Sequence, residues 1–130
     1  MAKPREVKSI YIGAPAVFAL ELECKHINEA FGDYGCYIVG SSLHRPDWRD
    51  VDVRYIMKDE EFAKLFPDAG QNWEMDTRWL LLTVSISEYL SKRTGLPIDF
   101  QIQPQTHANE RHPKPRSATG LTIRKRKEAQ

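Results

Sequence analysis

The sequence predicts an α/β (α+β) domain in which helices back one face of a small mixed three-stranded sheet. Apolar residues recur at helical spacing in segments 17–31 and 76–93, and they alternate with polar residues in segments 51–55 and 97–103. The loop between the first two strands is too short for a parallel crossover, whereas helical sequence long enough for one separates the second and third. We therefore expect the order helix, strand, strand, helices, strand.

The first helix is predicted from apolar positions at steps of three and four: Val17, Leu20, Cys24, Ile27 and Phe31. Pro15 suits its first turn and Gly32 its end. Three basic residues within 3–8 imitate the charged start of a secretory leader. The helical pattern continues through Glu21, Glu23 and Lys25, which favours a folded amphipathic helix and a cytoplasmic protein.

Two strands are predicted on either side of a polar loop. An apolar run, Cys36 to Val39, follows a glycine-containing turn and ends at Gly40. The loop covers Ser41 to Arg49. The next strand alternates between an apolar face and a charged face: Val51, Val53 and Tyr55 on the first, and Asp50, Asp52 and Arg54 on the second.

Two helices and a last strand are predicted next. Asp59 is expected to cap a short helix to Phe66, which residues 67–72 break. Asp76 is expected to cap a longer helix that ends near Gly95 and has residues 80–84 buried. The apolar stripe of this longer helix contains Trp79, Thr83, Ile86 and Leu90. The last strand, Pro97 to Gln103, places Ile98, Phe100 and Ile102 on one side and Asp99, Gln101 and Gln103 on the other.

Length and charge predict one folded domain, residues 1–103, followed by a basic and flexible tail, residues 104–130. The chain has 130 residues and a net charge of +1. Residues 104–130 hold seven Lys or Arg against two Glu, a net +5, so the rest holds twelve against sixteen, a net −4. Such a tail can contact nucleic acid through phosphate neutralisation, although basic tails are also common as plain solvated segments. Cys24 and Cys36 lack the spacing of a metal or redox motif and are expected to be reduced, packed thiols. No stretch is apolar enough to cross a membrane.

Three aspartates are expected on the polar face of the sheet. Asp50 and Asp52 point the same way, about 6.5 to 7 Å apart along the strand. Asp99 reaches the same point if the third strand pairs beside the second. Three carboxylates in one place repel each other unless a cation lies between them, and carboxylate oxygens are ligands that Mg²⁺ prefers. The alternative is a solvated polar face of a half-covered sheet.

A phosphate cradle is expected where the first strand ends. Gly40 lets backbone N–H groups approach a ligand, and the hydroxyls of Ser41 and Ser42 can donate to phosphate oxygens. Arg54 follows the acidic pair on the same face, where it could steady a phosphate or pair with a neighbouring carboxylate. A phosphate cradle that faces a carboxylate metal site is what phosphoryl or nucleotidyl transfer requires.

These residues resemble the motif of the DNA polymerase β-like nucleotidyltransferase superfamily: an apolar residue, Gly, Gly or Ser, a loop, Asp-apolar-Asp-apolar, and a later strand-borne acid. The matching segments are Val39-Gly40-Ser41, Asp50-Val51-Asp52-Val53 and Ile98-Asp99-Phe100. The likeness extends to small, poorly characterised members found in bacteria and phages. It implies a nucleotidyltransferase-like fold over residues 39–102, about half of the chain.

The resemblance implies an enzyme that moves a nucleoside monophosphate from a nucleoside triphosphate onto an acceptor hydroxyl. It places Asp50, Asp52 and Asp99 on two Mg²⁺ ions, and Gly40 and Ser41 on the triphosphate. Because larger relatives use a further domain to hold base and acceptor, a homodimer or another partner is expected. The alternative is a catalytically silent, antitoxin-like module of the same fold that contacts a protein or a nucleic acid.

Overall fold

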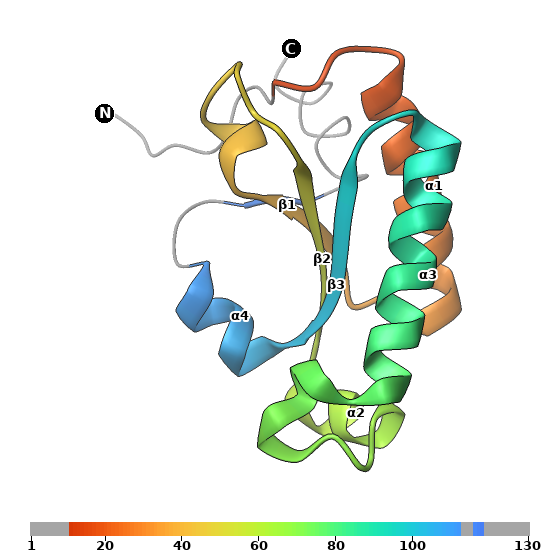
Figure 1. Cartoon of the computed structure of the whole chain (residues 1–130), viewed down its shortest axis with the longest axis vertical. Helices are drawn as coiled ribbons and strands as arrows, with labels where there is room; N and C mark the ends of the chain where they lie inside the picture. Colours follow the sequence, from red (N-terminus) through yellow and green to blue (C-terminus); the bar gives the residue numbers. More distant parts are fainter. Residues whose placement is uncertain (1–10, 113–115, 119–130) are drawn as a thin grey trace.

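The three predicted strands form a mixed sheet in the computed structural model, which describes residues 11–112 and 116–118 (Figure 1). β1 (Cys36–Val39) pairs antiparallel with β2 (Val51–Met57), and β2 pairs in parallel with β3 (Ile98–Pro104). The mixed character of the sheet and the order of its elements are therefore confirmed. No helix of the described part of the chain has the length and apolar character that spanning a membrane needs.

A short fourth strand, β4 (Ser117–Ala118), was not predicted. It pairs antiparallel with the outer edge of β1 and gives the strand order β3-β2-β1-β4. The sheet has this additional strand because the chain returns from the far edge, after β3, to the edge of β1 that the first three strands leave unpaired. Period-two patterning cannot indicate so short a strand.

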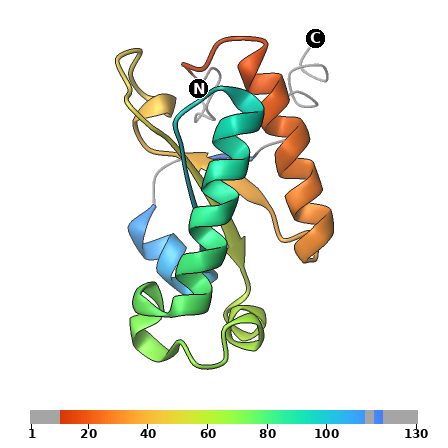
Figure 2. The same cartoon turned by 45° about the vertical axis from the view of Figure 1, so that its right-hand side comes forward.

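Two long helices cover one face of the sheet side by side, α1 (Ala16–Phe31) and α3 (Thr77–Thr94) (Figures 1 and 2). The predicted apolar faces meet in the core, where the following side chains are buried: Leu20, Cys24 and Ile27 of α1, Trp79, Thr83 and Leu90 of α3, and Val51, Val53, Tyr55, Ile98, Phe100 and Ile102 of the strands. Cys24 and Cys36 are buried as reduced thiols, as predicted.

The predicted helix ends are confirmed by their backbone geometry. Gly32 ends α1 with φ 111°, and Gly95 ends α3 with φ 77°. At the start of α3, the Asp76 carboxylate accepts a hydrogen bond of 3.0 Å from the backbone N–H of Trp79. A left-handed residue at the end and an oxygen acceptor at the start satisfy backbone groups that a helix leaves unpaired.

The expectation that residues 80–84 are well buried is wrong. Leu80, Leu81 and Val84 are 40%, 69% and 51% exposed, Leu82 is half-buried against the core, and only Thr83 of this segment is buried. A helix that packs on one side of a sheet buries a single stripe, and this stripe follows Trp79, Thr83 and Leu90. The run of leucines extends beyond that stripe on both sides, so hydrophobicity alone overstated its burial.

The segment that connects β2 to α3 in the sequence contributes an aromatic cluster to the core. It includes Phe62 of α2 (Asp59–Leu65) and Trp73 of the 3₁₀ helix η2 (Gly70–Met75), whose rings are 5.4 Å apart. Trp73 also packs edge-on against Trp79 at 5.1 Å and against His107 at 5.0 Å. Both tryptophans are therefore packing residues, and for Trp79 this agrees with its place in the predicted apolar stripe.

The predicted boundary after residue 103 does not separate a folded body from an arm. β3 runs to Pro104, and α4 (Gln105–Arg111) follows it directly. Asp59 does not cap its own helix as expected, because Lys58 is the N-cap of α2. Its carboxylate instead accepts hydrogen bonds from the N–H of Thr106 at 3.0 Å and from its hydroxyl at 2.6 Å, which ties α4 to α2.

α4 also changes the expectation that helices back only one face. It lies on the side of the sheet opposite α1 and α3 (Figure 1), and its Ala108 is fully buried. Near α4 the second face is closed, since Ile56 and Gln103 are buried there too. Residues 113–115 and 119–130, which hold most of the predicted basic tail, lie outside the described residues.

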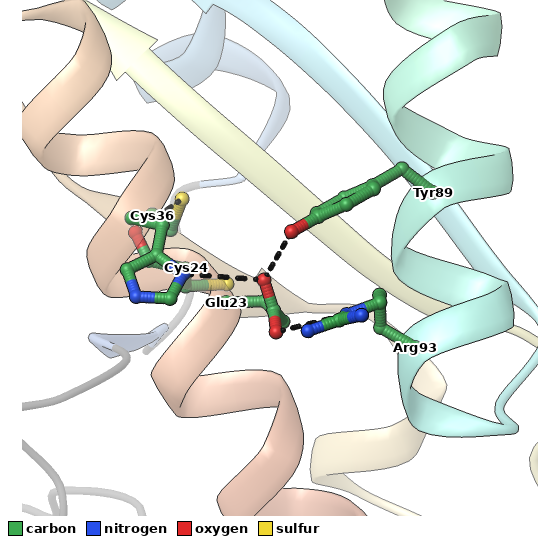
Figure 3. A network of polar contacts seen from close by, with 6 residues as sticks. Glu23, Cys24, Cys36, Tyr89 and Arg93 are labelled. Carbon is green, nitrogen blue, oxygen red and sulfur yellow. Dashed lines mark hydrogen bonds and ion pairs between the residues drawn. The ribbon is translucent and has the colours of Figure 1, made fainter.

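A buried carboxylate joins the two long helices. Glu23 of α1 accepts a 2.6 Å hydrogen bond from the Tyr89 hydroxyl of α3, and its other oxygen lies 3.3 Å from Nε of Arg93 (Figure 3). His26 adds a contact of 3.3 Å. The Tyr89 hydrogen bond, helped by His26 and Arg93 against the opposing effect of burial, lowers the pKa of Glu23. The sequence assigned Glu23 to the polar side of α1, and the packing of α3 beside α1 buries it.

Candidate functional site

Two of the three predicted carboxylates lie next to each other on the sheet. Asp52 of β2 and Asp99 of β3 are register partners on parallel strands, and neighbouring strands lie about 4.7 to 4.9 Å apart. Both side chains project from the face opposite the buried Val53 and Phe100. Asp52 is half-buried, and 49% of the Asp99 side chain is exposed. The predicted convergence of Asp52 and Asp99 is therefore present at the level of the backbone.

The environment of Asp52 disfavours its charged form. Burial raises the pKa of Asp52, Arg54 opposes this rise, and the nearby carboxylates of Asp99 and Asp50 add to it. A group of like charges in a half-buried place is a site where a bound cation relieves repulsion. The oxygen donors of Asp52 and Asp99 fit a hard cation such as Mg²⁺.

Asp50 does not complete a metal cluster in this geometry. It is exposed and lies before the first residue of β2. Over residues 11–112 and 116–118, no three or more His, Cys, Asp or Glu side chains are grouped so that they could hold a metal ion. The structure thus brings Asp52 and Asp99 together and leaves Asp50 at the margin.

Gly40 approaches the carboxylate of Asp52 closely. It follows Val39, the register partner of Asp52, and its φ of 84° and ψ of −157° belong to a region that glycine alone adopts readily. A Cβ at this position would clash with Oδ2 of Asp52, closer than 3.0 Å, and would lie 3.4 Å from its Cγ. The absence of a side chain at residue 40 is what lets the turn backbone reach the carboxylate.

The two serines after Gly40 have different surroundings. They begin the single 3₁₀ turn η1 (Ser41–Leu43), in which Ser41 is half-buried and Ser42 is fully buried. The carbonyl of Ser42 accepts a 2.8 Å hydrogen bond from the N–H of Tyr11. Trp48 also donates its indole N–H to the carbonyl of Tyr11, so Trp48 fastens the loop. Ser41 is therefore better placed than Ser42 to meet a ligand.

Strand carbonyl groups hold the guanidinium group of Arg54. Arg54 is only 7% exposed, and its Nη1 donates to the carbonyl of Asp99 at 2.7 Å and to that of Val53 at 3.1 Å. Its Nη2 lies 3.5 Å from Oδ2 of Asp99. Of the two interpretations that the sequence left open, pairing with a neighbouring carboxylate describes these contacts. Arg54 thereby positions Asp99, and its contact with a nucleotide stays a prediction.

Two basic residues that sequence reasoning missed lie on the same face as Arg54. Arg116 places its guanidinium 5.2 Å from the ring centre of Tyr37, and Tyr37 is the register partner of Arg54. Burial, and then Arg54 and Arg116, lower the pKa of His112. No motif marks these residues, because His112 is placed by the end of α4 and Arg116 by the return of the chain to β4.

Comparisons of the chain with protein-family models, with curated proteins and with solved structures found no match.

Proposed function

We propose that this protein is a Mg²⁺-dependent nucleotidyltransferase with a nucleotidyltransferase-like fold, which transfers a nucleoside monophosphate from a nucleoside triphosphate onto an acceptor hydroxyl. The observation that carries the proposal is the register pairing of Asp52 with Asp99, with the Gly40 turn against Asp52. A close backbone turn beside paired carboxylates is the arrangement that a phosphate chain and its metal ions need.

Asp52 and Asp99, with Asp50 drawn in by the ligand, would hold the metal ions. Bound Mg²⁺ would stabilise the charge that develops on the α-phosphate. Gly40 and Ser41 would orient the triphosphate through backbone N–H groups and a hydroxyl.

The proposed reaction exchanges one bond to phosphorus for another. Asp99, the more exposed carboxylate, would take the proton of the acceptor hydroxyl. The hydroxyl oxygen then bonds to the α-phosphorus, the bond to the bridging oxygen breaks, and pyrophosphate leaves with that electron pair. Arg54 would keep Asp99 in place during this step through its contacts with the Asp99 carboxylate and carbonyl.

The test is thermal stability with each nucleoside triphosphate, with and without Mg²⁺. A ligand that binds the folded state raises the melting temperature, by an amount that grows with its concentration relative to Kd. We expect a rise that requires both Mg²⁺ and Asp52 and that is absent in Asp52→Asn. Asp68→Asn is the matched control, because Asp68 is exposed and lies between α2 and η2. A shift of equal size in Asp52→Asn would contradict the proposal.

A second candidate function is a silent binding or regulatory module that contacts a protein or a nucleic acid. The contacts between Arg54 and Asp99 favour it, because they engage a carboxylate that the enzyme needs for metal. This candidate predicts no nucleotide-dependent stabilisation in wild type. It also predicts that partner binding depends on the basic residues after Gly120 and not on Asp52 or Asp99.

A nucleotide-binding site on so small a domain leaves the base and the acceptor to be held by another surface. We therefore also propose that the protein works as a homodimer or with a partner. Light scattering at saturating nucleotide and Mg²⁺ should give a mass above that of one chain, 15.0 kDa. A monomer under these conditions would contradict the proposed dimer.

A further inference from the structure

Three basic side chains gather on the sheet face that α4 partly covers: Arg54, His112 and Arg116, here called the basic cluster. Arg54 projects from β2, His112 follows the last turn of α4, and Arg116 comes just before β4. Burial lowers the pKa of His112, and the positive charges of Arg54 and Arg116 add to this effect, as expected for charges close to its ring. The return of the chain after α4 therefore adds positive charge to the face that carries Asp52 and Asp99.

The residues around Arg116 hold it without neutralising it. Its Nη2 donates to Oδ1 of Asn109 at 3.0 Å, and its guanidinium lies over Tyr37. Neither neighbour carries a negative charge, and within the described residues no carboxylate lies within ion-pair distance of Arg116. Asp99 is engaged by Arg54. Of the two guanidinium groups in the basic cluster, Arg54 is paired with Asp99, and Arg116 has no carboxylate partner among the described residues.

Several polar atoms of the basic cluster are buried without a hydrogen-bond partner in the described part of the chain. They are Nε of Arg54, Nε2 of His112 and Nη1 of Arg116. Arg54 is more than nine-tenths buried, so its unpaired Nε–H cannot be satisfied by bulk water. Unpaired buried N–H donors of a guanidinium group are satisfied well by an acceptor that is itself anionic.

Arg54 of the basic cluster lies one step along the same face of the sheet from Asp52 and Asp99. Arg54 and its register partners Tyr37 and Gln101 form the row of the sheet two residues along from Asp52 and Asp99. Two residues of a strand span about 6.5 to 7 Å. Successive phosphates of one chain can therefore reach from the carboxylates to the basic cluster.

We infer that the basic cluster binds the phosphate chain of the nucleoside triphosphate, and that Arg116 is a phosphate ligand supplied by the segment after α4. The identity of the ligand rests on the proposed function. Arg116 would use its unpaired Nη1, while Asn109 and Tyr37 keep its plane fixed. Arg116, which the charge pattern placed in a flexible tail, would then line the phosphate site.

The experiment is calorimetric titration with inorganic tripolyphosphate in the absence of Mg²⁺, which tests the phosphate contacts without the metal. We expect wild type to bind and Arg116→Gln to bind at least about ten-fold more weakly, a loss typical of a charge-assisted hydrogen bond. Arg116→Lys should recover only part of the affinity, because an ammonium lacks the guanidinium fork. Arg78→Gln removes an exposed charge from α3, on the opposite side of the sheet from α4, and is the matched control, with an affinity within about two-fold of wild type.

Two results would overturn the inference: no binding of tripolyphosphate by wild type, or equal affinities for wild type and Arg116→Gln. A single-stranded oligonucleotide that binds through Arg116 while tripolyphosphate does not would also overturn it and assign the basic cluster to nucleic acid. If Arg116→Gln does not fold, Asn109→Ala removes the hydrogen bond that holds Arg116 and keeps its charge. That variant should bind tripolyphosphate more weakly than wild type, and unchanged binding would count against the inference.

The Asp52→Asn variant separates this inference from the proposed function. If it responds to nucleotide and Mg²⁺ as wild type does, while tripolyphosphate binding depends on Arg116, then the transferase proposal fails and the anion site stands. If nucleotide stabilisation requires Asp52 but tripolyphosphate binding ignores Arg116, the transferase proposal stands and this phosphate site fails.

Discussion

Replacing Gly40 by alanine tests how closely the turn after β1 approaches Asp52. At φ 84° and ψ −157°, an alanine is strained by about 1–3 kcal/mol, because this backbone region is almost confined to glycine. The new methyl group also clashes with Oδ2 of Asp52, so the carboxylate must rotate away. We assign about 1 kcal/mol to that displacement, the low end for overpacking, since the end of a side chain can move. The expected loss in free energy of unfolding is therefore about 2–4 kcal/mol.

Urea unfolding followed by tryptophan fluorescence measures this loss. Gly95→Ala is the matched control, because Gly95 also has positive φ, 77°, but nothing lies within 4 Å of its added Cβ. It should cost about 1–2 kcal/mol. In an Asp52→Ala background, the cost of Gly40→Ala should contain the backbone strain but no longer the clash with the carboxylate. The difference between the two costs is a coupling free energy of about 1 kcal/mol. A cost for Gly40→Ala no greater than that of Gly95→Ala, with no coupling to Asp52, would refute the close approach.

Three further variants test contacts that hold the domain together. Glu23→Gln should flatten the dependence of stability on pH. Because the folded protein lowers the pKa of Glu23, the stabilisation by its carboxylate is complete above the ordinary pKa of 4.5 and is lost as the pH falls through the pKa of the folded state. The urea midpoints of wild type and variant should therefore converge in acid. Trp79→Phe removes a buried 2.8 Å hydrogen bond from the indole to the β3 carbonyl and should cost about 1–3 kcal/mol in urea unfolding; a neutral result would contradict the role of that bond. Asp59→Ala removes both hydrogen bonds to Thr106 and should speed amide hydrogen exchange in α4 while leaving α3 protected; unchanged exchange in α4 would show that other contacts hold it.

Much of the sheet and its main helices could be predicted because local patterns report them directly. Alternation in β2 and β3 and the three-and-four spacing in α1 and α3 identify the faces that the core buries. Gly32, Asp76 and Gly95 mark helix ends because each satisfies a local backbone requirement. For the same reason the turn at Gly40 was anticipated, and the structure adds its contact with Asp52.

The predictions that failed concern which surface an element meets. Hydrophobicity suggested that residues 80–84 were buried, but burial depends on the direction in which α3 faces the sheet. Charge suggested that the chain leaves the domain after residue 103, but α4 is held there by Asp59, which lies far from it in the sequence. Glu23 is of a residue type that is usually exposed, and it is buried here because Tyr89 and Arg93 of α3 contact it.

Periodicity and connection length were enough to predict the order of the elements and their inward faces. They left open whether the third strand pairs beside the second, and the structure shows that it does. The sequence also marked Asp50, Asp52 and Asp99 as candidates, but not which of them would meet. Tertiary structure decided that Asp52 and Asp99 are neighbours while Asp50 stays at the margin. It also decided that Arg116 returns to the face of Arg54. Such contacts join residues far apart in the chain, so they follow from the packing of whole elements and not from any local pattern.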